Sequence, residues 1–207
     1  MSSQPDPAGP VAATHRPLDV ALDRLAVDAC SGVTIIGGFP ASGKSTASAH
    51  LAAVVNAIIL DKDTFAAGLE AAVMAELTGN PYDRDSDTYA RVVKPHIYAA
   101  VIHQALLAGQ RVPVIVDAPF IGQIRSAAQE RLSLADYLTR TERIAVPAVR
   151  TIWISAPPNQ IHDRMTTRNE PRDAPKLCDW DAYRSEVLDS GVDAQARSVV
   201  DHVIENN

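Results

Sequence analysis

The stretch "GGFPASGKST", residues 37–46, decides the fold of this 207-residue chain. Residues 38–45 match the pattern G-x-x-x-x-G-K-[ST], which joins a β-strand to an α-helix around a phosphate group. The glycines let successive backbone N–H groups point at phosphate oxygens, and the following helix adds the positive end of its dipole. In this pattern Lys44 reaches the β- and γ-phosphates, and the Ser45 hydroxyl ligates Mg²⁺. The residues predicted to contact the nucleotide are Gly38, Ala41, Ser42, Gly43, Lys44, Ser45 and Thr46.

Short apolar runs alternate with longer helical stretches around this loop. Runs typical of buried strands occur at residues 33–36, 57–60, 112–116, 149–154 and 199–204. Helical pattern covers residues 18–30, 45–55, 64–77, 88–108, 124–141, 158–168 and 179–188, and residues 169–177 are predicted to be irregular. Crossovers of this length place the strands in a parallel sheet with helices on both faces. We therefore predict an α/β fold of the P-loop NTPase type, with about five parallel strands between helices and a helical lid.

The composition argues against several classes of protein. The net charge is −6 and the isoelectric point is near 5.4, whereas proteins that mainly bind nucleic acid carry a basic stripe. The two cysteines, Cys30 and Cys178, lie far apart in the sequence and do not have the spacing of metal ligands. Such sparse cysteine usage fits a reducing compartment. The apolar stretches are too short to span a bilayer, and the N-terminus lacks a signal-peptide pattern. We expect a cytoplasmic protein without a membrane partner.

The residues after the third predicted strand distinguish hydrolysis of the phosphate from its transfer. The N-K-x-D motif that reads guanine in switch GTPases does not occur in the sequence. Many P-loop ATPases place an acid directly after the strand-end aspartate to activate water, but Ala118 and Pro119 follow Asp117 here. This pattern favours transfer to a bound hydroxyl. Asp117 has two open interpretations, as a Mg²⁺ ligand or as a residue that orients substrate.

Transfer to a hydroxyl requires a carboxylate near the acceptor oxygen. Asp63 follows the second predicted strand, whose end lies at the same edge of the sheet as the phosphate loop, and we predict that it is the catalytic base. Asp61 lies on the same side of an extended chain and is the alternative base or a support for it. Asp63 also starts a helix, so a purely structural capping role is the competing interpretation.

Three arginines near the C-terminal third form a candidate lid. Arg164 and Arg168 are four residues apart on one helix face, and Arg172 follows Pro171 in the next loop. Phosphoryl transfer needs cations over the migrating group, which a mobile lid supplies while excluding water. We predict that these arginines are catalytic, and a solvated charged surface is the alternative.

The substrate is expected to meet the segment between the base and the third strand. The domain prediction is a flexible tail at residues 1–17 and a single domain at 18–207, with a substrate-recognition insert at about 64–98 and the lid at about 162–177. The insert is rich in polar and aromatic side chains, and a solvated loop is the alternative. The residues predicted to contact substrate are Asp61, Arg84, Asp85, Tyr89, His96 and Phe120.

The order GFPASGKST, LDKD, VIVDAPF and R-x-x-x-R-x-x-x-R-D resembles the small-molecule and polynucleotide P-loop kinases, including the zeta-toxin and chloramphenicol phosphotransferase group. The resemblance covers roughly residues 32–177 and consists of motifs. It implies that Asp63 is the base, that Arg164, Arg168 and Arg172 are lid residues, and that ATP and Mg²⁺ are the cofactors. Polynucleotide kinases carry an arginine three residues after the base, where this chain has Ala66.

Three functions follow as hypotheses. The first is an ATP-dependent kinase that phosphorylates a hydroxyl of a small molecule such as an antibiotic, nucleoside or sugar-like metabolite. The second is a kinase of polynucleotide 5′-hydroxyls, which Ala66 and the acidic charge disfavour. The third is a non-catalytic nucleotide-binding module, which would need neither Asp63 nor an arginine lid. The sequence predicts no oligomeric state.

Overall fold

A computed structural model of the protein describes residues 16–84, 86–170 and 173–207. Most of the predicted tail, together with Asp85 and Arg172, therefore lies outside the described residues. The first helix begins at Pro17, which was expected to end the tail.

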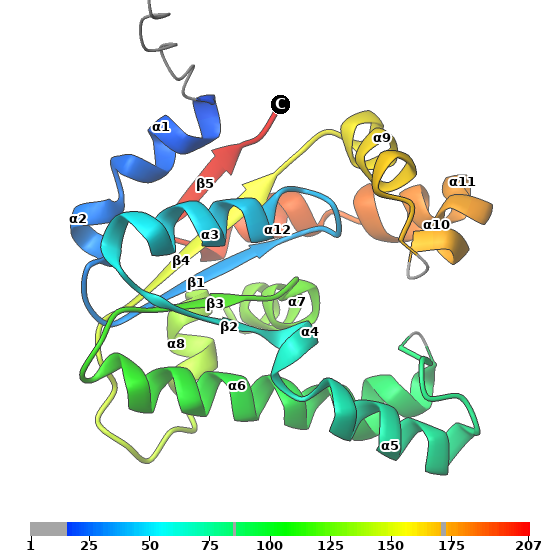
Figure 1. Cartoon of the computed structure of the whole chain (residues 1–207), viewed down its shortest axis with the longest axis horizontal. Helices are drawn as coiled ribbons and strands as arrows, with labels where there is room; N and C mark the ends of the chain where they lie inside the picture. The colour runs from blue at the N-terminus through cyan, green and yellow to red at the C-terminus, as the bar shows by residue number, and fades with distance from the viewer. Residues whose placement is uncertain (1–15, 85, 171–172) are drawn as a thin grey trace, which may run out of the picture.

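Five parallel strands form one sheet at the centre of the molecule (Figure 1). In chain order they are β1 (Val33–Gly38), β2 (Ile58–Asp61), β3 (Val114–Asp117), β4 (Val149–Ser155) and β5 (His202–Glu205). Their order across the sheet is β2-β3-β1-β4-β5. The predicted α/β fold with five parallel strands is confirmed.

Helical segments connect the strands and cover both faces of the sheet (Figure 1). Before the long helix of the insert they are α1 (Pro17–Asp23), α2 (Ala26–Ala29), α3 (Lys44–Val55), α4 (Lys62–Phe65), α5 (Ala67–Thr78) and the π-helical turn η1 (Tyr89–Val93). The later segments are α6 (Lys94–Gly109), α7 (Ile121–Glu130), α8 (Leu134–Thr139), α9 (Pro158–Arg168), α10 (Ala174–Cys178), α11 (Trp180–Tyr183), η3 (Arg184–Leu188) and α12 (Val192–Val199).

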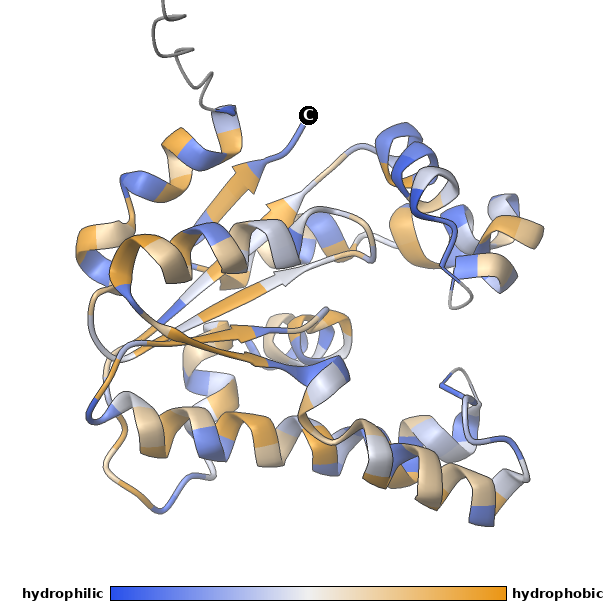
Figure 2. Cartoon of the chain, in the orientation of Figure 1, coloured by the Kyte–Doolittle hydropathy of each residue, from blue (hydrophilic) through white to orange (hydrophobic). Residues whose placement is uncertain are grey.

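Alternate residues of the central strands face two separate apolar cores. Ile36 and Ile152 pack with α1, α2 and α3 on one face of the sheet. Ile35 and Trp153 pack on the other face, in a larger core with α6, α7, α8 and α12. Figure 2 shows the strands mostly in hydrophobic colours and the loop after α5 in hydrophilic ones. Burial of both faces explains why the fully buried strands β1 and β3 are mostly apolar.

Several helices differ from the predicted ones. The helix predicted at 18–30 is divided into α1 and α2, and that at 124–141 into α7 and α8, because Arg131 adopts a left-handed φ of 57° and ends α7. Helix α10 (residues 174–178) takes up residues 174–177 of the stretch predicted to be irregular; it has a proline in its first turn, where the missing N–H costs nothing. Helix α12 was not predicted, although Val192, Ala196 and Val199 have helical spacing and are buried.

The sheet brings the predicted functional loops to one edge. Asp61 at the end of β2 pairs in register with Asp117 at the end of β3, and Asp117 pairs with Ile36 of β1, just before the phosphate loop. The carboxyl ends of parallel strands therefore meet beside the loop, as expected for ligand sites in this class of sheet. Among the described residues, no helix combines the length and hydrophobicity needed to cross a membrane.

Candidate functional site

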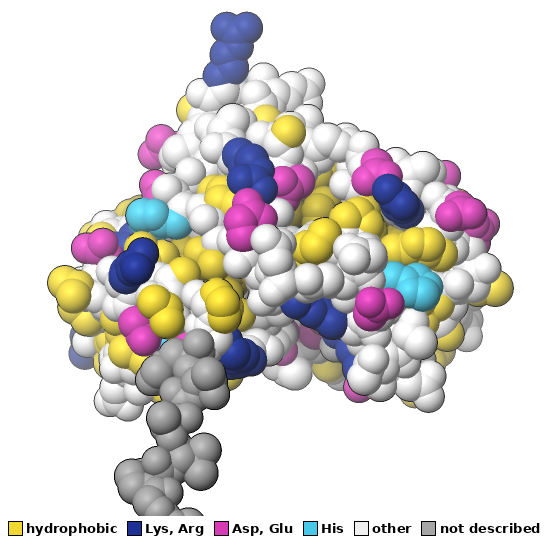
Figure 3. Space-filling model, turned by 90° about the horizontal axis from the view of Figure 1, so that it is seen from above, with side chains coloured by type: hydrophobic (Ala, Val, Ile, Leu, Met, Phe, Trp, Pro, Cys, Tyr) yellow, Lys and Arg dark blue, Asp and Glu magenta, His cyan; other side chains and the backbone are white. Residues whose placement is uncertain are grey.

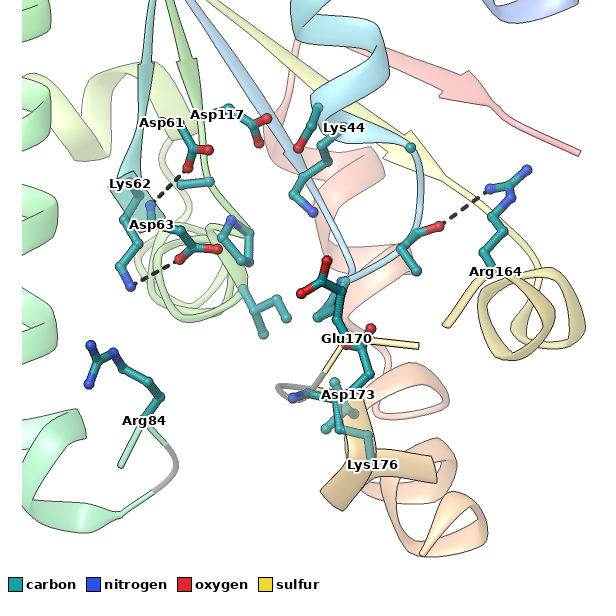
Figure 4. Close-up of a pocket in the computed structure, with 18 of the residues that line it drawn as sticks. Lys44, Asp61, Lys62, Asp63, Arg84, Asp117, Arg164, Glu170, Asp173 and Lys176 are labelled. Atoms are coloured by element: carbon teal, nitrogen blue, oxygen red, sulfur yellow. Dashed lines mark hydrogen bonds and ion pairs between the residues drawn. The ribbon is translucent and has the colours of Figure 1, made fainter. Parts of the chain in front are cut away.

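A cleft of about 1950 Å³ opens at this edge of the sheet. One wall is the phosphate loop with the start of α3, the opposite wall comes from α4, α5 and η1, and the third side comes from α9 to η3 (Figures 1 and 4). Predicted site residues that line the cleft are Ala41, Gly43, Lys44, Ser45, Thr46, Asp61, Asp63, Arg84, Tyr89, Asp117, Arg164 and Arg168.

The phosphate loop is held in a curled conformation by contacts from the chain's C-terminus. Ala41 and Gly43 have φ angles of 59° and 104°. A side chain at Gly43 would also lie 2.3 Å from Nδ2 of Asn206, so only glycine fits at this position. That Nδ2 donates a hydrogen bond to the Ser42 carbonyl at 2.7 Å. The loop is therefore curled in the way that points backbone N–H groups at a phosphate.

Lys44, Ser45 and Asp117 meet at the bottom of the cleft. Lys44 is buried, its Nζ donates to the Phe39 carbonyl at 2.9 Å, and the amine points into the cleft (Figure 4). Burial raises the pKa of Asp117, while the charge of Lys44 and a hydrogen bond from Ser45 act in the opposite direction. A carboxylate and a hydroxyl beside a phosphate site form a donor set that fits Mg²⁺, because this ion keeps several waters and needs few protein ligands.

Asp61 and Asp63 occupy different positions although they are two residues apart. Asp61 caps α4, because its Oδ1 accepts a hydrogen bond from the Asp63 amide at 2.8 Å. The Asp63 side chain is half-exposed, lines the cleft and points toward it from the first turn of α4 (Figure 4). Both carboxylates line the cleft, but Asp61 is engaged with the backbone of α4, whereas the side chain of Asp63 points toward the cleft.

A buried charged cluster, which the sequence analysis missed, lies behind Asp63. We define it as Lys62, Glu70 and Tyr89, each less than 10% exposed. Arg84 borders it, with Nε 3.5 Å from Glu70 and its guanidinium over the Tyr89 ring. The signal that could have revealed Glu70 is its position among apolar residues of α5, where an acid is out of place.

Arg164 and Arg168, the two predicted lid arginines that the structure describes, form contacts with different partners. Nη1 of Arg164 donates to the Ser42 carbonyl at 3.2 Å, and its Nη2 donates to the Asn206 carbonyl at 3.0 Å. Arg164 thus lies on the far side of the phosphate loop from Lys44 (Figure 4). This position does not support the predicted contact with the migrating phosphoryl group. Arg168 forms a two-pronged ion pair with the fully buried Asp173.

The model of a family described as an AAA domain matches residues 33–188. The chain belongs to this family of P-loop kinases. No curated protein gives a significant sequence match to the chain. The predicted resemblance to P-loop kinases is therefore confirmed at the level of the family.

Solved structures are similar to the chain in fold. Shikimate kinase from Acinetobacter baumannii in complex with shikimate superposes with a TM-score of 0.53 at 16% identity, covering 90% of this chain and 88% of that one. TT1252 from Thermus thermophilus has a TM-score of 0.46 at 21% identity, covering 86% and 89% of the two chains. At this level of identity the first likeness supports the P-loop kinase fold and says nothing about the acceptor.

Four residues predicted to contact the nucleotide or the substrate do not line the cleft. Gly38 and Ser42 do not line the cleft; Ser42 is fully buried, and its amide donates to the Phe39 carbonyl, so both residues shape the loop. Phe120 is fully buried, with its ring 5.3 Å from that of Tyr98, and His96 is exposed on α6 away from the cleft. These positions do not support direct contact of Phe120 or His96 with a substrate in the cleft.

Proposed function

We propose that the protein is an ATP- and Mg²⁺-dependent kinase that transfers the γ-phosphate to a hydroxyl group of a small molecule. The observation that carries this proposal is the position of Asp63, whose carboxylate enters the cleft opposite the wall formed by the phosphate loop (Figure 4). The absence of an acid directly after Asp117 in the sequence adds to it, because Ala118 and Pro119 cannot activate water. Together these features fit a bound alcohol as acceptor.

In the proposed reaction the acceptor hydroxyl attacks the γ-phosphorus of ATP. Asp63 takes the hydroxyl proton as the new oxygen–phosphorus bond forms, and the bond from the γ-phosphorus to its bridging oxygen breaks to release ADP. The phosphate loop and Lys44 hold the β- and γ-phosphates throughout. The product is a phosphate monoester of the acceptor, and the proton remains on Asp63 until solvent removes it.

Ser45 and Asp117 would hold Mg²⁺, which when bound supplies charge neutralisation of the phosphates. Their oxygen atoms fit the ion's preference, and Asp117 is buried beside Lys44. A cation at this place would stabilise the ionised form of Asp117, which burial disfavours.

A small acceptor is favoured over a polynucleotide by charge. The chain has a net charge of −6. On the face seen in Figure 3, acidic and basic side chains are interspersed, whereas nucleic acid is normally bound by a positively charged groove. Ala66 also lacks the guanidinium that would bind a substrate phosphate at that position.

The exposed thiols of Cys30 and Cys178 agree with a reducing compartment, and we propose the cytoplasm.

The test incubates the purified full chain with ATP, Mg²⁺ and a panel of hydroxylated metabolites, nucleosides, antibiotics and 5′-hydroxyl oligonucleotides. Mass spectrometry should detect the gain of one phosphate on a small molecule, and the Lys44→Ala variant should give none. Phosphorylation of the oligonucleotides alone would replace the proposal with the polynucleotide alternative. ATP binding with no product and no ADP release would indicate a non-catalytic module.

A further inference from the structure

The cluster of Lys62, Glu70 and Tyr89 is chemically unusual for an apolar core. Lys62 is 7% exposed, Glu70 2% and Tyr89 3%. Removing a lysine and a glutamate from water costs several kcal/mol per ion unless each charge is paired. Each charge in the cluster therefore needs a partner. The contact from Lys62 to Asp63 leads out of the cluster and indicates which residue the cluster affects.

The ammonium of Lys62 has three polar partners. Nζ donates to Oη of Tyr89 at 2.8 Å, lies 3.1 Å from Oε1 of Glu70, and donates to Oδ1 of Asp63 at 3.3 Å. The Tyr89 hydroxyl in turn donates to Oε1 of Glu70 at 2.6 Å. Two of the three partners are buried, and the third is the half-exposed carboxylate that lines the cleft.

Electrostatics keep Lys62 charged despite its burial. Desolvation alone would lower its pKa, but the hydrogen bond with Tyr89 and the nearby charges of Asp63 and Glu70 raise the pKa above its ordinary value. Burial and the bond to Glu70 also raise the pKa of Tyr89, so its hydroxyl keeps its proton and can donate. The cluster therefore presents a permanent positive charge to Asp63.

The three members of the cluster come from three segments, so the cluster joins α5 and η1 to α4, the helix that carries Asp63. Lys62 and Asp63 are on α4, Glu70 is on α5, and Tyr89 is in the π-helical turn η1. Turns of this kind are frequent at functional sites. A shift of α5 or η1 would therefore move the ammonium and, with it, the carboxylate of Asp63.

We propose that Lys62, fixed by Glu70 and Tyr89, is a positioning residue that orients the Asp63 carboxylate toward the acceptor hydroxyl. This inference rests on the proposed function, in which Asp63 is the base. The buried ammonium contacts one carboxylate oxygen, Oδ1, at 3.3 Å and so restricts the orientations open to this group beside the cleft. Misplacement of a reacting group by about 1 Å can cost about a hundredfold in rate, so the contact is large enough to matter for turnover.

The test measures ADP release from Mg·ATP by the full chain in the presence of the hydroxylated compound that the panel identifies as its acceptor. Lys62→Met and Glu70→Gln should each lower kcat about ten- to a hundredfold and change the Kd for Mg·ATP less than twofold. Tyr89→Phe removes one oxygen only and should lower kcat in the same direction, which keeps the test usable if Glu70→Gln does not fold.

The matched control is Asp193→Asn on α12, away from the cleft. Asp193 accepts hydrogen bonds from Trp153 at 2.9 Å and Ser155 at 2.7 Å, so this variant also disrupts a partly buried polar network. It should lower the melting temperature without lowering kcat. Wild-type kcat in Lys62→Met and Tyr89→Phe, with Asp63→Asn inactive, would overturn the positioning role alone. Wild-type turnover in Asp63→Asn would overturn the proposed function itself.

Discussion

At the scale of single residues, two neighbouring aspartates differ in what surrounds them. Asp61 is engaged with its own backbone, since its carboxylate caps α4 through the Asp63 amide. Asp63 is held by Lys62 and faces the cleft. A carboxylate that already accepts a backbone N–H stabilises a helix end, whereas one that faces a ligand site can accept a substrate proton. The two substitutions to asparagine should therefore have different effects.

The Asp63→Asn variant should bind ATP normally and lose transfer. The amide has nearly the same size as the carboxylate but cannot accept the acceptor's proton, so turnover should fall about a hundred- to ten-thousand-fold. Product mass measures transfer and ATP titration measures binding. Asp61→Asn is the control, because asparagine is also a good helix cap, and its activity should remain much higher. An inactive Asp61→Asn beside an active Asp63→Asn would assign the base to Asp61.

Asp117 is expected to contribute to function at the expense of stability. Its pKa is raised by burial, so the folded state favours the protonated form, and the ionised carboxylate destabilises the fold above that pKa. Asp117→Asn should therefore raise the melting temperature of the ligand-free protein at neutral pH by a few degrees, about 2–4 °C per kcal/mol. The difference from wild type should shrink as the pH falls through the raised pKa and disappear below about pH 3, where Asp117 is protonated in both the folded and the unfolded state.

In the same Asp117→Asn variant, Mg·ATP should not produce the Mg²⁺-dependent rise in melting temperature that we expect in the wild type. Ligands stabilise a protein according to their concentration relative to Kd, by about 2.7 kcal/mol at a hundredfold excess. Melting curves with ATP plus Mg²⁺ and with ATP plus EDTA would separate the metal's contribution. An equal Mg²⁺-dependent increase in both proteins would show that Asp117 does not hold the ion.

At the scale of elements, helix α9 carries two arginines, Arg164 and Arg168, that bind different parts of the chain. Arg164 ties α9 to the phosphate loop and to the C-terminal residues, whereas Arg168 binds Asp173 in the segment that leads to α10. Figure 1 shows α9 to α11 across from α4 and α5, and residues of both groups of helices line the cleft. Helix α9 is therefore tied to the phosphate loop through Arg164 and to the buried Asp173 through Arg168.

Arg164→Ala should weaken ATP binding more than it slows transfer. The lost hydrogen bonds support the curled loop, and bonds of charged groups contribute about 1.5–3 kcal/mol, so the Kd for ATP should rise about tenfold. Isothermal titration would measure it. Arg168→Ala is the matched control on the same helix, and its Kd should stay within about twofold of wild type. A kcat effect without a change of Kd in Arg164→Ala would restore the interpretation of Arg164 as a lid cation.

At the scale of the whole molecule, Asn206 near the end of the chain contacts the phosphate loop. Asn206 follows β5, receives a bond from Arg164, donates its own amide to the Ser155 carbonyl and reaches the Ser42 carbonyl. Segments more than 150 residues apart in the sequence are thus joined at the nucleotide site. The last strand contributes to binding through this contact, although it carries none of the predicted catalytic residues.

Asn206→Ala should lower both ATP affinity and stability. Loss of one buried hydrogen bond costs about 1 kcal/mol, which corresponds to a drop of about 2–4 °C in melting temperature for a protein of this size. Asn207→Ala is the control, because Asn207 is exposed at the chain end. Equal melting temperatures and ATP affinities for both variants and wild type would show that the C-terminal contact is not needed by the loop.

Local patterns in the sequence determined the strands, the phosphate loop and the family. The reason is that a buried parallel strand needs a continuous apolar run, and a phosphate loop needs glycines and a lysine at fixed spacing, so both are visible without tertiary context. The place of Asp63 and Asp117 at the sheet edge followed from the same logic. Where helices end was less predictable, since the left-handed Arg131 that ends α7 carries no glycine signal.

Only the tertiary structure decided which side chains act together. Nothing in the sequence places Glu70 and Tyr89 against Lys62, because these contacts join segments 8 to 27 residues apart whose packing depends on the whole insert. Nor does spacing show that Arg164 holds the phosphate loop from behind, 122 residues away from Ser42. The sequence thus determined the chemistry available at the site, and long-range packing determined which groups face the cleft and which support them, because burial and pairing of charges depend on the whole fold.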